Sequence, residues 1–304
     1  MATADVVTFA GGLGGAKSGG SGADSDVGII VATGGKIVIT EEISGTATAT
    51  TISSIDLNTI TGANVEVDAS AITGAVTINA VSGNTVITTG GGADDISTGT
   101  GADTISLGAG NDTVDSQTGK DTITLGAGRD VVDINAVVTD GSMASDSDAT
   151  NFTTITDFAL SASAITTVNL SNAANFQAAT TIGEADLLNF GGGTTAVAAD
   201  ANETSVTVNS QTVKYTVNDG LIVVTSNAAA ITTDAFAIDL LETLVGGNVT
   251  DGLTAAVEVL GNTYVLSNNS DANENADMVV KLTDVTGITG LELVDASVSE
   301  AAGT

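Results

Sequence analysis

The chain has 304 residues, and its 37 acidic and 6 basic side chains give a formal net charge of −31. It contains no His, Cys, Pro or Trp, which excludes His-based catalytic triads, thiol nucleophiles, zinc fingers and haem attachment. With so few basic residues we expect no binding to nucleic acid, whose phosphates need Lys and Arg. Apolar residues make up 42% of the chain and are mostly Ala, Val and Ile; with the abundant Thr they favour strands around a core.

Residues 1–50 form a Gly-rich N-terminal arm with the first strands. Residues 1–5 lack the basic region that precedes the apolar run of a secretory signal, so we expect no N-terminal signal of that kind. No apolar stretch approaches the roughly 18–20 residues of a membrane span. Short apolar pieces lie at residues 6–10 and 27–32. Two interpretations stay open: a flexible arm, or a strand that adds to the sheet edge of a neighbouring subunit.

Five nonapeptides run without insertion from Thr89 to Asp133. The fourth position is always glycine: Gly92, Gly101, Gly110, Gly119 and Gly128. The sixth position is always aspartate: Asp94, Asp103, Asp112, Asp121 and Asp130. The eighth position is always β-branched and apolar: Ile96, Ile105, Val114, Ile123 and Val132.

Each half of the nonapeptide has a physical interpretation. The Gly-rich half turns sharply and exposes backbone carbonyls, and the Asp adds a hard anionic oxygen; such oxygens suit Ca²⁺ at roughly 2.3–2.6 Å. The other half is a short strand whose middle side chain points inward. Two nonapeptides would complete one turn of a flattened parallel solenoid with a thin core, so that metal binding supplies folding free energy. The alternative is a Gly/Asp-rich linker.

These repeats resemble the RTX (repeats-in-toxin) family, whose nonapeptide Gly-Gly-x-Gly-x-Asp-x-U-x, with U a large apolar residue, forms a calcium-binding parallel β-roll. The resemblance implies that Ca²⁺ lies between turns n and n+2, held by the five Asp side chains and by the carbonyls of the five Gly residues. The pairs it implies are Asp94 with Asp112, Asp112 with Asp130, and Asp103 with Asp121. Lys120 and Arg129 lower the local negative charge, so we expect the last two pairs to bind most weakly.

The nine-residue interval extends upstream in degraded form. Gly74 and Gly83 precede the nonapeptides at the same spacing. Val76 and Thr85 take the Asp position there, so no side chain at that position binds calcium. We therefore predict one β-solenoid over residues 51–135, with calcium-binding repeats at 89–133 and a metal-free, structural part at 51–88.

The second half of the chain indicates a different kind of β structure. Residues 136–151 are an acidic loop, whose Asp140, Asp146 and Asp148 form either a solvated segment or another calcium site. Residues 152–304 are predicted to be an antiparallel β-sandwich or jelly roll, which makes the whole fold all-β. Its strands alternate polar and apolar residues, and one segment has helical spacing. The predicted strands are 205–209, 212–217, 221–225 and 263–267, and the predicted helix is 233–244.

Residues 276–283, followed by 285–288, resemble the end of RTX surface-layer and related secreted proteins. The resemblance implies an uncleaved C-terminal signal for type I secretion, and a place outside or on the surface of a Gram-negative cell. Low cytosolic calcium would leave the carboxylates repelling one another, so that the chain stays unfolded for export. Outside the cell, calcium at roughly millimolar concentration matches the weak binding of extracellular modules.

Enzymatic activity is not expected from this sequence. Residues 19–23 come nearest to a lipase nucleophile elbow but lack its last Gly, and the 3% aromatic content argues against a sugar site. We expect a calcium-dependent, self-assembling extracellular structural protein, the subunit of a surface layer or a cell-surface filament, with itself and calcium as partners. The alternative is a secreted RTX adhesin or biofilm-matrix module that binds a surface or glycan. A cell-surface polysaccharide is a further candidate partner.

Overall fold

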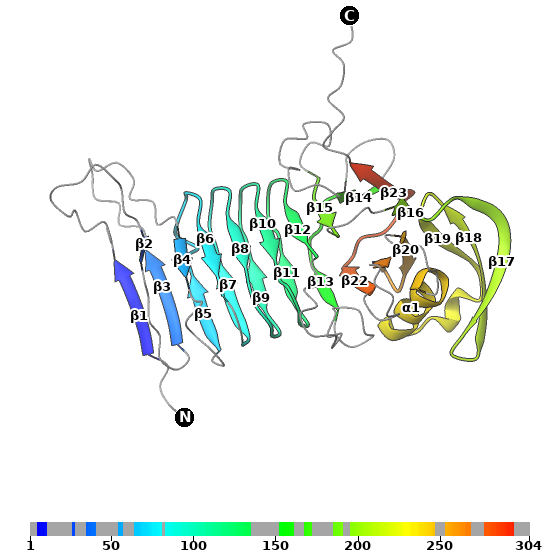
Figure 1. Cartoon of the computed structure of the whole chain (residues 1–304), viewed down its shortest axis with the longest axis horizontal. Coiled ribbons are helices and arrows are strands. Elements are labelled where there is room, and N and C mark those ends of the chain that lie inside the picture. The colour runs from blue at the N-terminus through cyan, green and yellow to red at the C-terminus, as the bar shows by residue number, and fades with distance from the viewer. Residues whose placement is uncertain are drawn as a thin grey trace, which may run out of the picture.

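The fold is mostly β with one short α-helix in the described part of the chain, which confirms the all-β prediction in its main lines (Figure 1). The computed structural model describes residues 5–10, 26–27, 35–40, 54–56, 64–80, 83–134, 152–160, 167–171, 185–190, 195–246, 253–268 and 277–294. Within these ranges no helix has both the length and the apolar character that a membrane crossing requires.

Two sheets of parallel strands face each other over the first half of the chain, and successive strands alternate between them (Figure 1). The first sheet contains β1 (Asp5–Ala10), β3 (Gly35–Thr40), β5 (Val65–Asp68), β7 (Thr85–Thr88), β9 (Thr104–Ser106), β11 (Thr122–Thr124) and β13 (Thr153–Ile155). The second contains β2 (Asp26–Val27), β4 (Ser54–Asp56), β6 (Thr77–Asn79), β8 (Asp95–Ser97), β10 (Thr113–Asp115), β12 (Val131–Asp133) and β15 (Leu187–Asn189). This is the parallel β-roll that the nonapeptides predict.

The register of the roll follows from the length of the repeat. Thr113 aligns with Asp95 on one side and with Val131 on the other, so each turn advances by two nonapeptides. Because alternate residues of a strand face opposite sides, the eighth position points inward at every turn. Ile96, Val114 and Ile123 are each fully buried, and this column forms the core between the sheets.

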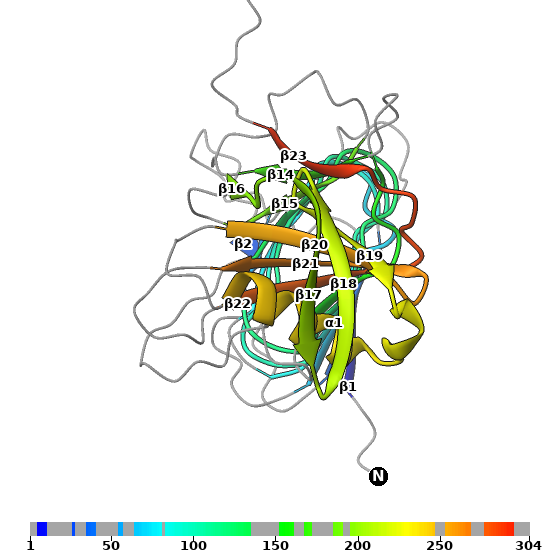
Figure 2. The same cartoon turned by 90° about the vertical axis from the view of Figure 1, so that its right-hand side faces the viewer.

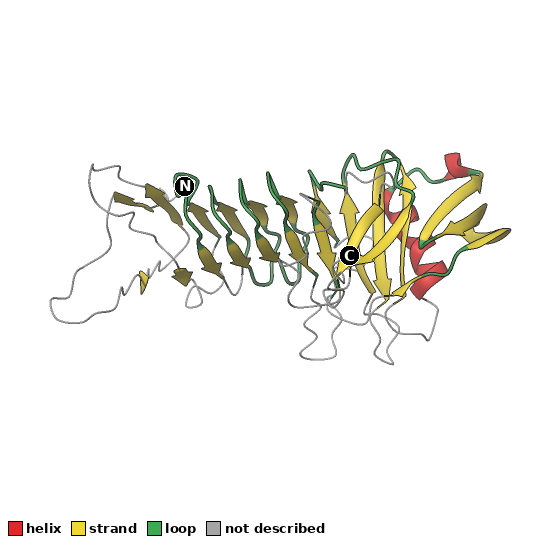
Figure 3. Cartoon of the chain, turned by 90° about the horizontal axis from the view of Figure 1, so that it is seen from above, coloured by secondary structure: helices red, strands yellow, loops and turns green. Residues whose placement is uncertain are grey.

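The sheets continue on both sides of the nonapeptides (Figure 3). On the N-terminal side β1 pairs with β3 and β3 with β5, so the apolar piece at residues 6–10 pairs within its own chain. On the other side β13 pairs with β11, and β15 with β12. The parallel strands of the roll therefore extend beyond residues 51 and 135, the predicted limits of the solenoid. Backbone pairing between strands needs neither the Gly nor the Asp of the repeat. The acidic segment with Asp140, Asp146 and Asp148 lies outside the described residues.

Beyond β13 the first sheet becomes mixed. β22 (Asp277–Leu282) pairs parallel with β13, and the order continues through β21 (Asn262–Asn268), β20 (Leu253–Val259), β19 (Leu221–Ser226), β18 (Gln211–Asn218) and β17 (Asp200–Val208). The predicted antiparallel strands are present, joined by a parallel β19–β20 pair. β16 (Thr195–Ala196) pairs with β20, and β14 (Thr167–Ser171) and β23 (Gly290–Val294) complete the second sheet. The result is one 14-stranded and one nine-stranded sheet running through the molecule.

The predicted helix packs on the outer face of the mixed sheet (Figure 2). α1 (Asp234–Leu241) begins after Thr233, whose hydroxyl accepts a hydrogen bond from the amide of Phe236 at 3.2 Å. A π-helical turn (Glu242–Gly246) follows it, and a 3₁₀ turn (Ala228–Ala230) precedes it. The buried residues of α1 form a second core with those of β20, β21 and β22, among them Phe236, Leu241, Tyr264 and Val279.

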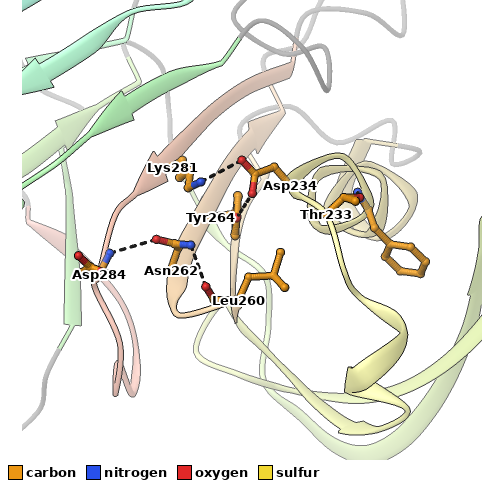
Figure 4. A network of polar contacts seen from close by, with 8 residues as sticks. Thr233, Asp234, Leu260, Asn262, Tyr264, Lys281 and Asp284 are labelled. Carbon is orange, nitrogen blue, oxygen red and sulfur yellow. Dashed lines mark hydrogen bonds and ion pairs between the residues drawn. The ribbon is translucent and has the colours of Figure 1, made fainter.

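A polar network joins α1 to the C-terminal strands (Figure 4). The Tyr264 hydroxyl donates to Asp234 Oδ1 at 2.7 Å, and Lys281 Nζ donates to Asp234 Oδ2 at 2.9 Å. At the end of β22 the amide of Asp284 donates to Asn262 Oδ1 at 3.1 Å. The strand that pairs with the roll, β22, is thereby also tied to the helix.

Candidate metal centre

The Asp residues of the nonapeptides lie in the loops that join the two sheets at either edge of the roll. The loops after β7, β9 and β11 hold Asp94, Asp112 and Asp130, which we call the first ladder. The loops after β8 and β10 hold Asp103 and Asp121, the second ladder. The Gly-rich half of each repeat forms these loops. Each Asp is the last loop residue, immediately before the first residue of the next strand.

Every Asp in the ladders is held by the turn before it. Asp112 Oδ1 accepts a hydrogen bond from the amide of Asp94 at 2.8 Å, and Asp130 Oδ1 accepts one from Asp112 at 2.8 Å. In the second ladder Asp121 Oδ1 accepts from the amide of Asp103 at 2.9 Å. These bonds span 18 residues, which is one turn. The structure thus brings together the three Asp pairs that the resemblance implies.

The turns upstream of the nonapeptides supply the first partner of each ladder. The amide of Val76 donates to Asp94 Oδ1 at 2.8 Å, and that of Thr85 donates to Asp103 Oδ1 at 2.7 Å. Val76 and Thr85 stand in the Asp column of the repeat but contribute only backbone here, apart from the Thr85 hydroxyl, which also donates to Asp103 Oδ1 at 2.8 Å. The first Asp of each ladder is therefore positioned without a carboxylate before it.

The second oxygen of each of the five carboxylates is buried and has no hydrogen-bond partner: Oδ2 of Asp94, Asp103, Asp112, Asp121 and Asp130. A buried carboxylate oxygen without a partner is strongly unfavourable. Burial raises the pKa of Asp112 to about 6, of Asp121 to about 7 and of Asp130 to about 8, and the charge of neighbouring Asp residues adds to each shift. Burial without a cation therefore favours the neutral acids, whereas a bound cation stabilises the charged carboxylates, whose hard oxygens fit Ca²⁺.

The glycines of the fourth position are required by close approach between turns. A Cβ on Gly110 would lie 1.5 Å from the carbonyl oxygen of Gly92, and one on Gly119 would lie 1.5 Å from that of Gly101. Gly110 has φ +149° and Gly119 has φ +150°, a conformation that other residues rarely adopt. These carbonyls belong to the same loops as the Asp residues, so the loops bring both kinds of oxygen together.

Side chains alone do not complete a metal site. In the ranges that the structure describes, no group of three or more acidic side chains is arranged to hold a metal ion. Ca²⁺ takes 6–8 oxygen ligands. The Asp side chains would therefore act together with backbone carbonyls, those of Gly92, Gly101, Gly110, Gly119 and Gly128 included, as the resemblance implies.

The two basic residues of the repeats have partners of their own. Lys120 Nζ lies 5.7 Å from the centre of the Phe152 ring, a distance at which cation–π attraction acts. The Arg129 amide donates to Asn111 Oδ1 at 3.1 Å, and Arg129 is largely buried. Weaker calcium binding at the 103/121 and 112/130 pairs stays a prediction.

Two acidic residues outside the nonapeptides complete the end of the first ladder. Asp186 Oδ1 accepts from the amide of Asp130 at 3.0 Å, and its Oδ2 accepts from Ala159 at 2.6 Å. Asp157 accepts from the amides of Leu125 and Gly126 at 2.7 and 2.8 Å. The nonapeptide spacing indicates neither residue, because 56 residues separate Asp130 from Asp186 and 32 separate Leu125 from Asp157, where one turn of the roll takes 18. A signal was present, since residues 186–188 repeat the Asp-x-U order of residues 130–132.

The comparisons with known proteins agree with this geometry. Residues 79–114 and 107–133 match the family model of the RTX calcium-binding nonapeptide repeat (4 copies). Comparison of the chain with curated proteins and with solved structures gives no significant match. The chain thus carries RTX calcium-binding repeats in a β-roll, and repeats of this kind are typical of extracellular proteins exported by type I secretion.

Proposed function

We propose that this protein is a calcium-dependent, self-assembling extracellular structural protein, the subunit of a cell-surface filament or surface layer. One observation carries the proposal: in the part of the chain that the structure describes, the 14-stranded sheet ends at each side in a strand with a single partner. Among the described strands, β1 pairs with β3 alone and β17 with β18 alone. The two edge strands lie at opposite ends of the long axis (Figure 1).

Edges placed in this way favour growth in one direction. An unpaired edge strand presents a row of amide and carbonyl groups to which another chain can pair. Contact between β17 of one copy and β1 of the next would be heterologous, and a heterologous contact that does not close into a ring builds a fibre. Charge on the two edge strands is confined to their first residues: Asp5 in β1, and Asp200 and Glu203 in β17, of which Glu203 pairs with Lys214 at 2.8 Å. Residues 6–10 and 204–208 carry no charged side chain, so contact between these parts adds little to the repulsion between chains of charge −31.

The calcium ladders would restrict assembly to the outside of the cell. Where calcium is scarce, folding at neutral pH would require the Asp side chains of the roll either to be protonated or to be buried with an uncompensated charge, so the chain remains unfolded. The segment that resembles a C-terminal secretion signal includes Met278, Val279 and Val280, which are buried in the folded protein. Such a signal is accessible only before folding, which supports export of an unfolded chain by type I secretion from a Gram-negative cell. The proposed role involves no catalysis.

The geometry of the β17–β18 hairpin identifies a substitution that tests whether the β17 edge is the contact. β17 and β18 are joined by Asn209 and Ser210, both with positive φ, as in the two-residue turns of hairpins. Hydrogen-bonded and non-hydrogen-bonded pairs alternate away from the turn, beginning with Val208 and Gln211. The amide of Ser205 therefore faces outward, toward a neighbour. Ser205→Pro removes this outward donor and leaves the pairing with β18 intact, whereas the control Ser205→Ala keeps the donor.

Light scattering and electron microscopy during a calcium titration, from chelator to about 10 mM, test the proposal. We expect the wild type and Ser205→Ala to form fibres or sheets that dissolve in chelator, and Ser205→Pro to fold with calcium but remain monomeric. Assembly of Ser205→Pro at the wild-type level would exclude the β17 edge as the contact. A wild type that folds with calcium and stays a monomer would overturn self-assembly and favour the adhesin.

A further inference from the structure

We propose that the protein has a calcium site beyond its nonapeptides. In this site the carboxylates of Asp186 and Asp130 bind the ion, and Asp157 holds the neighbouring loop at residues 125–126. The site would tie the C-terminal part of the fold to the roll. It requires calcium binding by the repeats, but it does not depend on self-assembly. The proposal is carried by the register of Asp186, by an unpaired buried oxygen and by the contacts of Asp157.

Asp186 occupies the place of the next Asp in the first ladder. Its Oδ1 accepts from the amide of Asp130 at 3.0 Å, as Asp130 Oδ1 accepts from Asp112 at 2.8 Å. Its strand has the same register, since Leu187 aligns with Val131 as Val131 aligns with Thr113. Two segments far apart in sequence thus reproduce the spatial relation of successive RTX turns.

A buried carboxylate oxygen at this position lacks a partner. Asp130 is 0% exposed, and its Oδ2 makes no hydrogen bond. The Asp186 carboxylate lies in register with Asp130 and accepts from the amides of Asp130 and Ala159. A divalent cation between Asp130 and Asp186 would supply the partner that Asp130 Oδ2 lacks, and backbone carbonyls would complete its shell.

At the last turn of the roll, the Asp157 side chain accepts backbone hydrogen bonds at the place where a further nonapeptide would have paired. Leu107, the residue that precedes Leu125 by one turn, donates its amide to the carbonyl of Thr124. The amide of Leu125 donates instead to Asp157 Oδ1 at 2.7 Å, and that of Gly126 donates to Oδ2 at 2.8 Å. Asp157 follows β13, which pairs with β22. Asp157 therefore links the last turn of the roll, through β13, to the mixed sheet.

The number of calcium ions bound by the full chain tests this site. Native mass spectrometry at saturating calcium would compare the wild type with Asp186→Asn, which keeps an acceptor for the amide of Asp130 but removes the charge. Asp95→Asn, at an exposed position of β8, makes the same change outside the ladders. Asp103→Asn alters the second ladder only. We expect Asp186→Asn to bind one ion fewer than the wild type, and Asp95→Asn to bind the same number.

Other outcomes separate failure of this site from failure of calcium binding. If Asp103→Asn loses calcium while Asp186→Asn binds as many ions as the wild type with equal affinity, Asp186 is a metal-free cap and the proposal is wrong. If the wild type binds no calcium, both ideas are wrong. Terbium-soaked crystals of the wild type give a measurement that does not depend on variant folding. We expect an anomalous peak within roughly 2.3–2.6 Å of Asp130 Oδ2 and Asp186, and peaks confined to the other Asp pairs would overturn the site.

Discussion

The backbone amide of Asp130 donates to the side chain of Asp186 at 3.0 Å, across 56 residues of sequence. The bond joins the last nonapeptide to the strand that follows it in space, β15. The same relation links Asp112 to Asp130 and Asp94 to Asp112 within the repeats. The carboxylate ladder therefore extends past the nonapeptides and into the part of the chain that leads to the mixed sheet.

Replacing a central ladder residue should weaken calcium-dependent folding. Asp112→Asn removes one anionic oxygen from each of the two pairs that include Asp112. Since ligand charge tunes calcium affinity, we expect the calcium concentration at the folding midpoint to rise by about tenfold or more. Circular dichroism during a calcium titration measures the midpoint. Asp95→Asn, the exposed control, should leave it unchanged, and equal midpoints for the two variants would contradict a ligand role for Asp112.

A methyl group at a fourth-position glycine should destabilise the loaded roll. The Cβ of Gly110→Ala would lie 1.5 Å from the Gly92 carbonyl oxygen, so backbone must move and φ must change. We expect the free energy of unfolding at saturating calcium to fall by about 3 kcal/mol or more. Gly261→Ala is the control, because Gly261 also has positive φ (+75°) but no atom beyond its two chain neighbours lies within 4 Å of where its Cβ would be. There we expect about 1 kcal/mol, and similar losses for both variants in chemical denaturation would contradict the crowding.

In chelator, the roll should be more stable in acid than at neutral pH. Burial raises the pKa of Asp112, Asp121 and Asp130 to about 6, 7 and 8, from a model-peptide value of 3.8. Groups with a raised pKa in the folded state stabilise it below the unfolded pKa, and this contribution is lost as pH rises through the folded pKa. Denaturant midpoints of the calcium-free chain should therefore be highest near about pH 4 and fall toward zero as the pH approaches neutrality. Midpoints that rise with pH over this interval would contradict the claim that these carboxylates are buried without a compensating charge.

The hydroxyl of Tyr264 should stabilise the C-terminal part without affecting the ladders. Tyr264→Phe removes the hydrogen bond to Asp234 at 2.7 Å inside the network that also holds Lys281. We expect a loss of about 1–2 kcal/mol in the free energy of unfolding, with an unchanged number of bound calcium ions. Tyr215→Phe, at a partly exposed position of β18, should change stability by less than about 0.5 kcal/mol. Equal effects of the two substitutions in thermal or chemical denaturation would show that the buried hydroxyl contributes nothing.

The sequence predicted the roll because its information is local and periodic. Ile96 and Val114 lie in the core, and Asp94 and Asp112 lie at one edge, since a nine-residue repeat places equivalent residues one above another. The helix at 234–241 was also predicted, over residues 233–244, from its apolar spacing. Non-local pairing was not predictable: β13 beside β22 and β12 beside β15 join segments that no spacing relates. Asp157 and Asp186 went unnoticed for the same reason.

Hydrogen exchange of four amides tests the central claim, that calcium compensates the buried carboxylates and so folds the roll. The amides of Asp94, Asp103, Asp112 and Asp130 each donate to the carboxylate of the next turn in the folded structure. We expect these amides to exchange freely at neutral pH in chelator and to become protected when calcium is added. Equal protection with and without calcium would contradict the claim, because the ladders would then be stable without a metal.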